Sequence, residues 1–155
     1  MTVGRGTMSV MYHMERDEWL AFVSRGTRTG KLATVRKDGS PHVAPIWFLV
    51  DTLDGVDHLV FTTGDDTVKG KALKRDPRFA LCVDLEEPPF SFVQFQAEAT
   101  ISEDLDELLD WATRLGARYV GAAAAEAFGK RNAVPGELLV RARITKVIAL
   151  AEIAD

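Results

Sequence analysis

The sequence predicts a mainly β domain of the α+β class, with about six antiparallel strands and a few peripheral helices. Most apolar residues fall in short runs that Gly, Pro and Asp interrupt, which is typical of strands. Asp-Gly pairs at 38–39 and 54–55 stand between such runs and are typical of hairpin turns. Helical spacing of apolar residues is limited to three segments, so strands joined by turns are expected to supply most of the core.

The composition is that of one globular domain: 155 residues, 46% of them hydrophobic and 27% charged. The single cysteine, Cys82, excludes an internal disulfide, and the three histidines show no metal-ligand spacing. A net charge of −4 disfavours a nucleic-acid partner, and no apolar run approaches the roughly 20 residues of a membrane helix. No secretory signal is evident. We therefore expect a cytoplasmic protein with no metal, no nucleic-acid partner and no membrane partner.

The first residues differ from the rest of the chain. Residues 1–13 lack periodicity and are expected to form a flexible N-terminal arm, so residues 14–155 would be the folded domain. Helices are expected at residues 15–24, 68–75 and 104–128, the last with a break near Gly116. A polar loop is expected at residues 129–136.

The six expected strands are residues 31–35, 42–50, 58–63, 79–84, 90–101 and 138–150. The second is apolar almost throughout after His42, which indicates burial on both faces, as in a closed barrel. Pro45 lies inside this strand and has no N–H to donate, so it indicates an edge, a bulge or a bend. A bend would free backbone groups to meet a planar polar ligand; the alternative is a barrel corner with Trp47 in the core.

The segment 62–71 carries the clearest chemical signal. Thr62 and Thr63 end a strand, and after a turn Lys69 and Lys71 stand at the start of a helix. Unpaired N–H groups, the positive end of the helix dipole and a lysine together suit a phosphate, although a capped surface helix with solvated lysines has the same pattern. The spacing excludes a nucleotide-triphosphate P-loop. Arg114 and Arg118 share a helical face and form either an anion clamp or a solvated surface.

These motifs together resemble a known family. The strand GKLATV at 30–35, the Asp38-Gly39 hairpin, the run PHVAPIWF at 41–48 and the segment KGKALKRDPR at 69–78 are similar to the pyridoxamine 5′-phosphate oxidase-like FMN-binding split β-barrel proteins. Within that family they are most like the actinobacterial F420-dependent flavin/deazaflavin oxidoreductases. The resemblance implies a homodimer of split β-barrels, with the cofactor sites at the interface.

The resemblance also implies roles for particular residues. Lys69 matches a lysine that contacts the cofactor phosphate, and Thr62 matches a nearby hydroxyl. Pro45, Ile46 and Trp47 match the stretch along the flavin ring, and Phe90 stands near an aromatic position that the partner subunit contributes. The full set of expected cofactor-binding residues is Thr34, Arg36, Pro45, Ile46, Trp47, Thr62, Thr63, Thr67, Lys69, Lys71 and Phe90. Two residues depart from the pattern: Thr67 where many members have Arg, and Ala72 where many have Asn.

The function that the resemblance implies is hydride transfer from reduced coenzyme F420 to a small unsaturated or carbonyl-conjugated substrate. The alternatives are an FMN-dependent reductase or oxidase of the same fold, and a non-catalytic flavin- or haem-binding protein. A local excess of basic residues suits the acidic tail of F420: Arg36, Lys37, Lys71, Lys74, Arg75 and Arg78. No catalytic residue is assigned. Tyr119, Arg118 and His42 are candidates for the proton donor, as is solvent.

Overall fold

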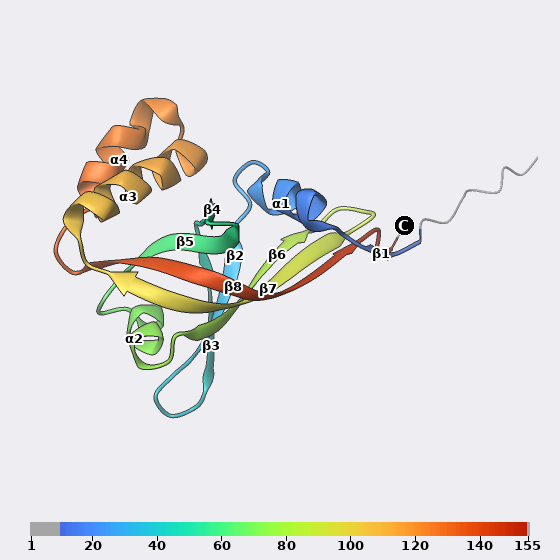
Figure 1. Ribbon diagram of the computed structural model, residues 1–155, viewed down its shortest axis with the longest axis horizontal. Coiled ribbons are helices and arrows are strands. Elements are labelled where there is room, and N and C mark those ends of the chain that lie inside the picture. Colours follow the sequence, from blue (N-terminus) through green and yellow to red (C-terminus); the bar gives the residue numbers. More distant parts are fainter. Residues whose placement is uncertain (1–9, 155) are drawn as a thin grey trace, which may run out of the picture.

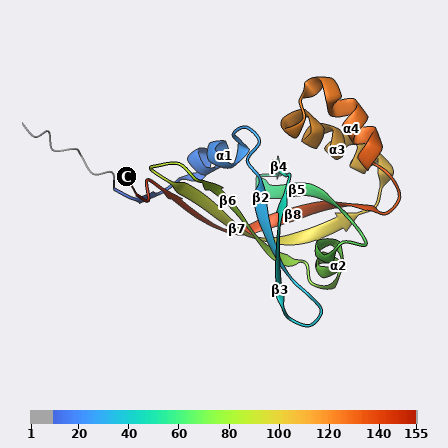
Figure 2. The same ribbon diagram turned by 180° about the vertical axis from the view of Figure 1, so that it is seen from behind.

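A single antiparallel sheet dominates the computed structural model, which describes residues 10–154 (Figure 1). The strands are β1 (Tyr12–His13), β2 (Gly30–Val35), β3 (Pro41–Ile46), β4 (Leu49–Leu53), β5 (Val56–Gly64), β6 (Arg78–Leu85), β7 (Ser91–Ser102) and β8 (Glu137–Ala151). Their order is β3-β2-β6-β7-β8-β5-β4, and β1 pairs with β8. The sheet is strongly coiled, so that β2 and β3 cross the long strands β7 and β8 steeply (Figure 1, Figure 2). The predicted mainly β architecture of antiparallel strands is confirmed.

The helices lie at the two ends and on one side of this sheet. They are α1 (Arg16–Ser24), α2 (Val68–Arg75), α3 (Leu105–Tyr119), the short 3₁₀ helix η1 (Ala122–Ala124) and α4 (Ala125–Asn132). In Figure 1, α1 lies near the free end of the β6–β7 hairpin, whereas α3 and α4 form a pair at the opposite end. None of these helices, within residues 10–154, is long and apolar enough to span a membrane.

The folded part of the chain begins slightly before the predicted end of the N-terminal arm at residue 13. Residues 1–9 lie outside the described residues. Tyr12 and His13 form β1 and pair with Ala151 and Leu150 of β8, so the end of the expected arm belongs to the sheet. Met14 continues this contact, because its N–H donates to the carbonyl of Ala149 (2.9 Å).

The two edges of the sheet are consecutive in the chain. The predicted strand 42–50 is interrupted at Trp47 and Phe48, which separate edge strand β3 from edge strand β4. Pro45 pairs with Lys31 in the edge strand β3, so the edge that it indicates is observed. This two-residue crossing joins the edges covalently, without a ladder between them, and leaves the barrel split.

The prediction that residues 42–50 are buried on both faces is wrong for the single chain. Side chains of β3 alternate, so that Ile46 is buried while Val43 and Pro45 are exposed. A strand at a sheet edge has one face against the core, and its other face is covered only if something outside the chain covers it.

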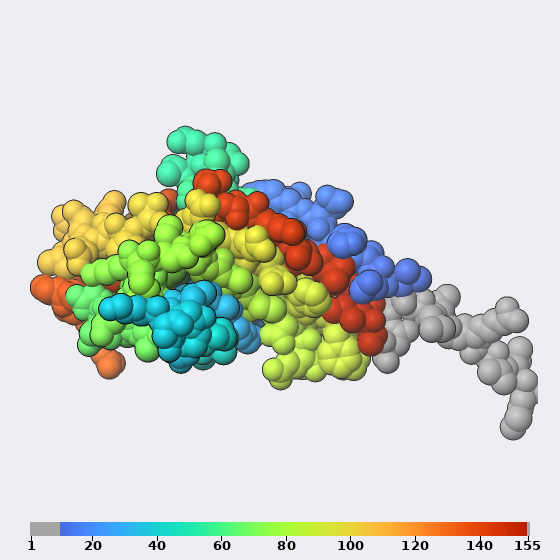
Figure 3. Space-filling model, turned by 90° about the horizontal axis from the view of Figure 1, so that it is seen from below, coloured from blue at the N-terminus to red at the C-terminus, as the bar shows by residue number. Residues whose placement is uncertain are grey.

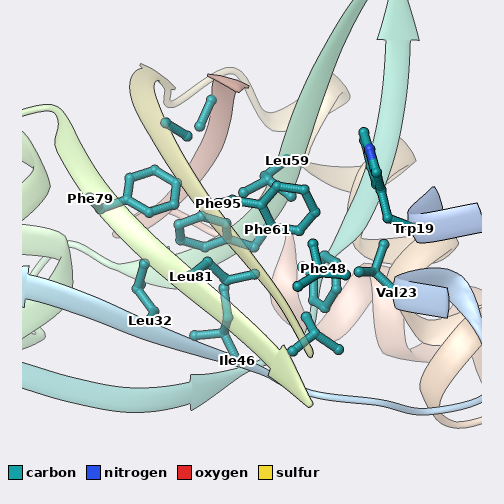
Figure 4. Close-up of a cluster of buried hydrophobic side chains, with 14 of the residues drawn as sticks. Trp19, Val23, Leu32, Ile46, Phe48, Leu59, Phe61, Phe79, Leu81 and Phe95 are labelled. Carbon is teal, nitrogen blue, oxygen red and sulfur yellow. The ribbon is translucent and has the colours of Figure 1, made fainter. Parts of the chain in front are cut away.

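The core fills the space inside the coiled sheet (Figure 4). Phe48, Phe61 and Phe95 are fully buried there. From α1, Trp19 enters one end of this core and meets Phe95 edge to face, with ring centroids 5.4 Å apart. The crossing residue Phe48 therefore belongs to the core, and it anchors the β3–β4 connection from the inside.

The helical insert breaks later than its sequence predicts. Gly116 lies inside α3, and the chain turns instead at Gly121, whose φ of 99° suits glycine. A Cβ at Gly116 would stand 2.9 Å from the ring of Phe128, so this glycine is where α4 packs closely on α3. Likewise α4 continues through Gly129 to Asn132, so the first half of the predicted loop 129–136 is helical.

Candidate functional site

A pocket of 350 Å³ opens where the β3–β4 crossing, the start of α2 and the α3–α4 pair meet. Its lining residues are Thr29, Pro45, Ile46, Trp47, Thr62, Lys69, Leu115 and Phe128. Five of these were expected from the sequence to contact a cofactor: Pro45, Ile46, Trp47, Thr62 and Lys69. Segments from residue 29 to residue 128 of the chain thus converge on one cavity.

The apolar wall of the pocket is built around Trp47. Its ring stacks on that of Tyr119, with centroids 4.9 Å apart and planes 2° from parallel, and Phe128 tilts against it at 5.7 Å. Trp47 is 39% exposed, so it is not a core residue, and the alternative of a barrel corner with Trp47 in the core is excluded. The wall offers a fixed flat surface with Pro45 and Ile46 beside it.

The polar end of the pocket carries Thr62 and Lys69. Thr62 stands near the end of β5, and Lys69 is in the first turn of α2, whose N–H groups point toward the positive end of the helix dipole. Lys69 takes part in none of the ion pairs found among residues 10–154. One end of the apolar pocket thus combines a hydroxyl, a cationic amine and a helix start. This combination suits an anion.

Thr67 and Thr63 hold this helix start in place. The Thr67 hydroxyl accepts from the Gly70 N–H (3.0 Å) and donates to the Gly64 carbonyl (2.7 Å), and it lies 3.1 Å from the hydroxyl of buried Thr63. A side chain at Gly70 would collide with the Gly64 carbonyl. With these protein partners the Thr67 proton is already used, so in this structure the pair positions α2, and contact with a cofactor stays a prediction.

The remaining expected residues lie outside the pocket. Thr34 is buried, its hydroxyl has no partner among the described residues, and it lines a different cavity of 500 Å³. Arg36 donates to the Pro41 carbonyl (2.7 Å) within the β2–β3 hairpin. Lys71 is exposed on α2. Phe90 lies at the β6–β7 turn, at the far end of the long strands from α2, so only a second copy could bring it here (Figure 1).

Sequence reasoning missed Thr29, Leu115 and Phe128. Thr29 lies in the loop before β2, which carries no motif. Leu115 is on the apolar face of α3, and Phe128 packs against Gly116. The close glycine contact is the signal that places α4 over the pocket, but it is visible only once the two helices are known to pack together.

Arg114 and Arg118 were expected to form either an anion clamp or, by default, a solvated surface, and only Arg114 is on the solvated surface. Arg114 forms an exposed ion pair with Asp110 (3.1 Å) and lies over the ring of Trp111. Arg118 instead points inward and donates to three carbonyls, those of Phe48 (2.6 Å), Val23 (2.7 Å) and Gly26 (3.0 Å). The two guanidinium groups therefore serve different neighbours.

Like Arg118, Tyr119 attaches the last turn of α3 to neighbouring segments of the chain. Its hydroxyl donates to the Arg28 carbonyl (2.9 Å) and accepts from the Phe48 N–H (3.2 Å). Burial raises the pKa of Tyr119. Neither Tyr119, Arg118 nor His42 lines the pocket, so none of the three candidate proton donors is placed to touch a ligand there.

Acidic side chains lie close to the polar end. Glu137 begins β8 opposite Gly64, and burial together with the charges of Asp66 and Asp65 raises its pKa, against the opposing effect of Lys69. No group of three or more His, Cys, Asp or Glu side chains within residues 10–154 is arranged to hold a metal ion. Among residues 10–154, Lys69 is the charged side chain that lines the pocket, and these carboxylates lie behind it.

Comparison with known proteins matches residues 16–151 to the family described as Pyridoxamine 5'-phosphate oxidase. The F420H(2)-dependent biliverdin reductase of Mycobacterium tuberculosis (strain CDC 1551 / Oshkosh) is 25% identical over 139 residues, which are 90% of each chain. A solved structure of an F420 reductase is 26% identical, with a TM-score of 0.61 over 82% of this chain and 94% of that one.

A structure of a conserved hypothetical protein from Mycobacterium tuberculosis has a TM-score of 0.74 at 24% identity. It covers 90% of this chain and 86% of its own length. The split β-barrel fold is therefore confirmed.

Glu137→Gln is expected to stabilise the fold at neutral pH. The pKa of Glu137 is raised on folding, so its contribution to the free energy of unfolding is largest at low pH and is lost as pH rises through the raised value. The gain from Gln should therefore vanish near pH 3, well below the ordinary Glu pKa of about 4.3, where this carboxyl is mostly protonated in both states. Urea denaturation at both pH values measures it. Glu126→Gln is the control, because Lys130 lowers the pKa of Glu126. A gain of equal size at both pH values would contradict this account of Glu137.

Proposed function

Because the chain belongs to the pyridoxamine 5′-phosphate oxidase family, we propose that it is an oxidoreductase that uses coenzyme F420. The reaction is the transfer of a hydride from the reduced deazaflavin to a small unsaturated or carbonyl-conjugated substrate. Two relatives whose names state a role for F420, each at least 25% identical, support the choice of cofactor.

The observation that carries the proposal is the convergence of a flat apolar wall and a phosphate-type end in one pocket. Pro45, Ile46 and Trp47 form the wall, and Thr62 with Lys69 forms the polar end. A tricyclic ring with a phosphate on its side chain has the same two parts. The residues present therefore fit a flavin or deazaflavin.

Each part of the pocket has a task in the proposed reaction. When bound, the reduced deazaflavin supplies the hydride. Trp47, held flat by Tyr119, orients the ring, while Leu115 and Phe128 shield it from water. Lys69 and Thr62 anchor the phosphate. Among the described residues, no carboxylic acid or histidine lines the pocket, so water is proposed to supply the proton that the substrate takes up with the hydride.

The acidic tail of F420 would leave the pocket past Lys69. Lys71 and Lys74 are exposed on α2, and Arg75 of α2 donates to the Val35 carbonyl (2.9 Å) at the base of the β2–β3 hairpin. The hairpin turn itself carries Lys37. These residues form a basic surface that continues from the phosphate end, where the glutamate tail needs positive charge.

An FMN-dependent reductase or oxidase is the second candidate. Lys69 is the single cation that lines the pocket among residues 10–154, which is sufficient for the one phosphate of FMN. The absence of an acid–base side chain from that lining also suits a flavin-binding protein without turnover. Haem is not supported, because neither His42 nor His58 lines the pocket, and the His58 ring lies 3.0 Å from the Val56 carbonyl.

The proposal includes a homodimer with the pocket at its interface. The side chains of Ala33, Val35, Pro41, Val43 and Pro45 are exposed on one face of the β2–β3 hairpin, and Val43 is 68% exposed. This hairpin stands on the molecular surface beside α2 (Figure 3). Pro45 belongs both to this apolar face and to the pocket lining. A second copy that covers the face would therefore also wall the pocket, and could contribute Phe90. We place the enzyme in the cytoplasm.

Lys69→Ala is expected to weaken cofactor binding about tenfold or more, because a charge-assisted hydrogen bond to phosphate is lost. The fold should be little affected, since Lys69 pairs with no described residue. Titration of each variant with F420 and with FMN, followed by cofactor fluorescence, measures the change. Lys130→Ala, which removes an equivalent charge from an exposed pair with Glu126, is the control. Unchanged cofactor affinity in Lys69→Ala would contradict the phosphate site and leave α2 as an ordinary capped surface helix.

Val43→Asp is expected to convert the dimer to a monomer, because a charge at the centre of a buried apolar face is strongly unfavourable. Light scattering at micromolar concentration should report twice the chain mass for the wild type and a single chain mass for the variant. Cofactor affinity should fall in the same variant, since the partner is absent from the pocket. A monomeric wild type would refute the shared site.

A further inference from the structure

A second cavity of 470 Å³ adjoins the pocket that we assign to the cofactor. It lies at the loop between α1 and β2, and its lining includes three basic side chains, Arg25, Arg28 and Lys31. Thr29 lines both cavities, so the two meet at this residue. A ligand of the first pocket that is long enough to pass Thr29 would reach the second.

Two of the three basic groups keep donors free. Lys31 is neutralised by Asp84, with Nζ and Oδ1 2.6 Å apart. Arg28 donates one N–H to the Phe22 carbonyl (2.8 Å) and lies over the Phe22 ring at 4.3 Å, which fixes the guanidinium and leaves its other N–H groups available. Arg25 is exposed and has no side-chain partner among residues 10–154.

The charged side chains around this cavity favour the binding of an anion. Besides Asp84, the lining contains one more carboxylate, Glu86, against Arg25 and Arg28. Burial and the positive charge of Arg25 lower the pKa of Arg28, with Glu87 acting in the opposite direction. The repulsion between two like charges is reduced when an anion binds between them.

The position of the cavity indicates which part of a bound molecule reaches it. In Figure 1 and Figure 2 the α1–β2 loop lies between α1 and the α3–α4 pair, on the other side of the sheet from α2. The phosphate end of the cofactor pocket, with Lys69, is at α2. The second cavity is therefore at the opposite end from the phosphate and from the basic surface that suits the cofactor tail.

We propose that Arg25 and Arg28 bind a carboxylate of the substrate. The substrate is then a conjugated molecule with an acidic side chain, long enough to span from the ring pocket past Thr29. This inference rests on the proposed function, because it takes the first pocket as the cofactor site. The one other source of such a carboxylate is the glutamate tail of F420, and the experiment separates the two.

The probes are a 1,4-naphthoquinone with a propionate side chain and its methyl ester, which differ in charge at one end only. With the wild-type enzyme and reduced F420, KM for the acid should be about tenfold below KM for the ester, with similar kcat. Arg25→Gln and Arg28→Gln should each remove most of this preference by raising KM for the acid. Arg114→Gln, which removes a charge from the outer face of α3, is the matched control and should keep it.

The outcomes are distinguishable. Arg25 is exposed, so Arg25→Gln tests the site even if Arg28→Gln loses stability with its bond to Phe22. Equal KM values for acid and ester in the wild type would overturn the inference. A loss of F420 affinity in Arg25→Gln without a change in the acid preference would assign the arginines to the cofactor tail and also overturn it.

A binding measurement tests the carboxylate site independently of the reaction. The chain has three tryptophans. Quenching of their fluorescence by the two probes, without cofactor, reports binding next to Trp47 where it is lost in Trp47→Phe. If the protein binds neither F420 nor FMN, the proposed function fails. Tenfold tighter binding of the acid that disappears in Arg25→Gln would still support the carboxylate site.

Discussion

The last turn of α3 is attached to the barrel by two neighbouring side chains, and the pocket depends on this attachment. Arg118 donates to the carbonyls of Val23, Gly26 and Phe48, and Tyr119 bonds to Arg28 and Phe48. Val23 is in the last turn of α1, Gly26 and Arg28 lie in the loop before β2, and Phe48 lies in the crossing between the sheet edges. The end of α1, the loop that carries Thr29 and the crossing that carries Trp47 are thereby held to one helix turn. A guanidinium suits the task of holding three carbonyls at once, since it has several fixed donors and stays charged even where burial lowers its pKa.

From this attachment the rest of the site follows. The crossing at Trp47 and Phe48 has no ladder partner, so without Arg118 and Tyr119 its backbone groups would lack hydrogen bonds inside the molecule. Each hydrogen bond to a charged group contributes about 1.5–3 kcal/mol, and a buried carbonyl left without a partner costs a similar amount. With the crossing fixed, Phe48 enters the core while Trp47 stacks on Tyr119 and faces the pocket. The same turn also fixes the loop that carries Thr29, where the two cavities meet.

Local signals predicted one part of this arrangement and missed another. Thr62 and Lys69 follow from a strand end and a helix start only seven residues apart, and Pro45 has no N–H, so both features were readable in the sequence. Arg118 was read as part of a surface pair because its partners lie 70 to 95 residues away in the chain. Its inward direction depends on tertiary packing, as do the positions of Leu115 and Phe128. The apolar character of residues 42–50 indicated a strand buried on both faces or covered by a second copy, and within one chain β3 lies at an open edge of the sheet.

The central claim is that this pocket holds a deazaflavin by its ring and its phosphate, with the acidic tail on the basic surface beyond Lys69. The most direct test is a titration of the wild-type protein with F420 and with FMN at low and at raised salt. The account predicts tighter binding of F420 than of FMN, and a loss of F420 affinity as salt rises, because exposed charges are screened over about 10 Å at 0.1 M. Tight, salt-insensitive binding of FMN with no measurable binding of F420 would contradict it.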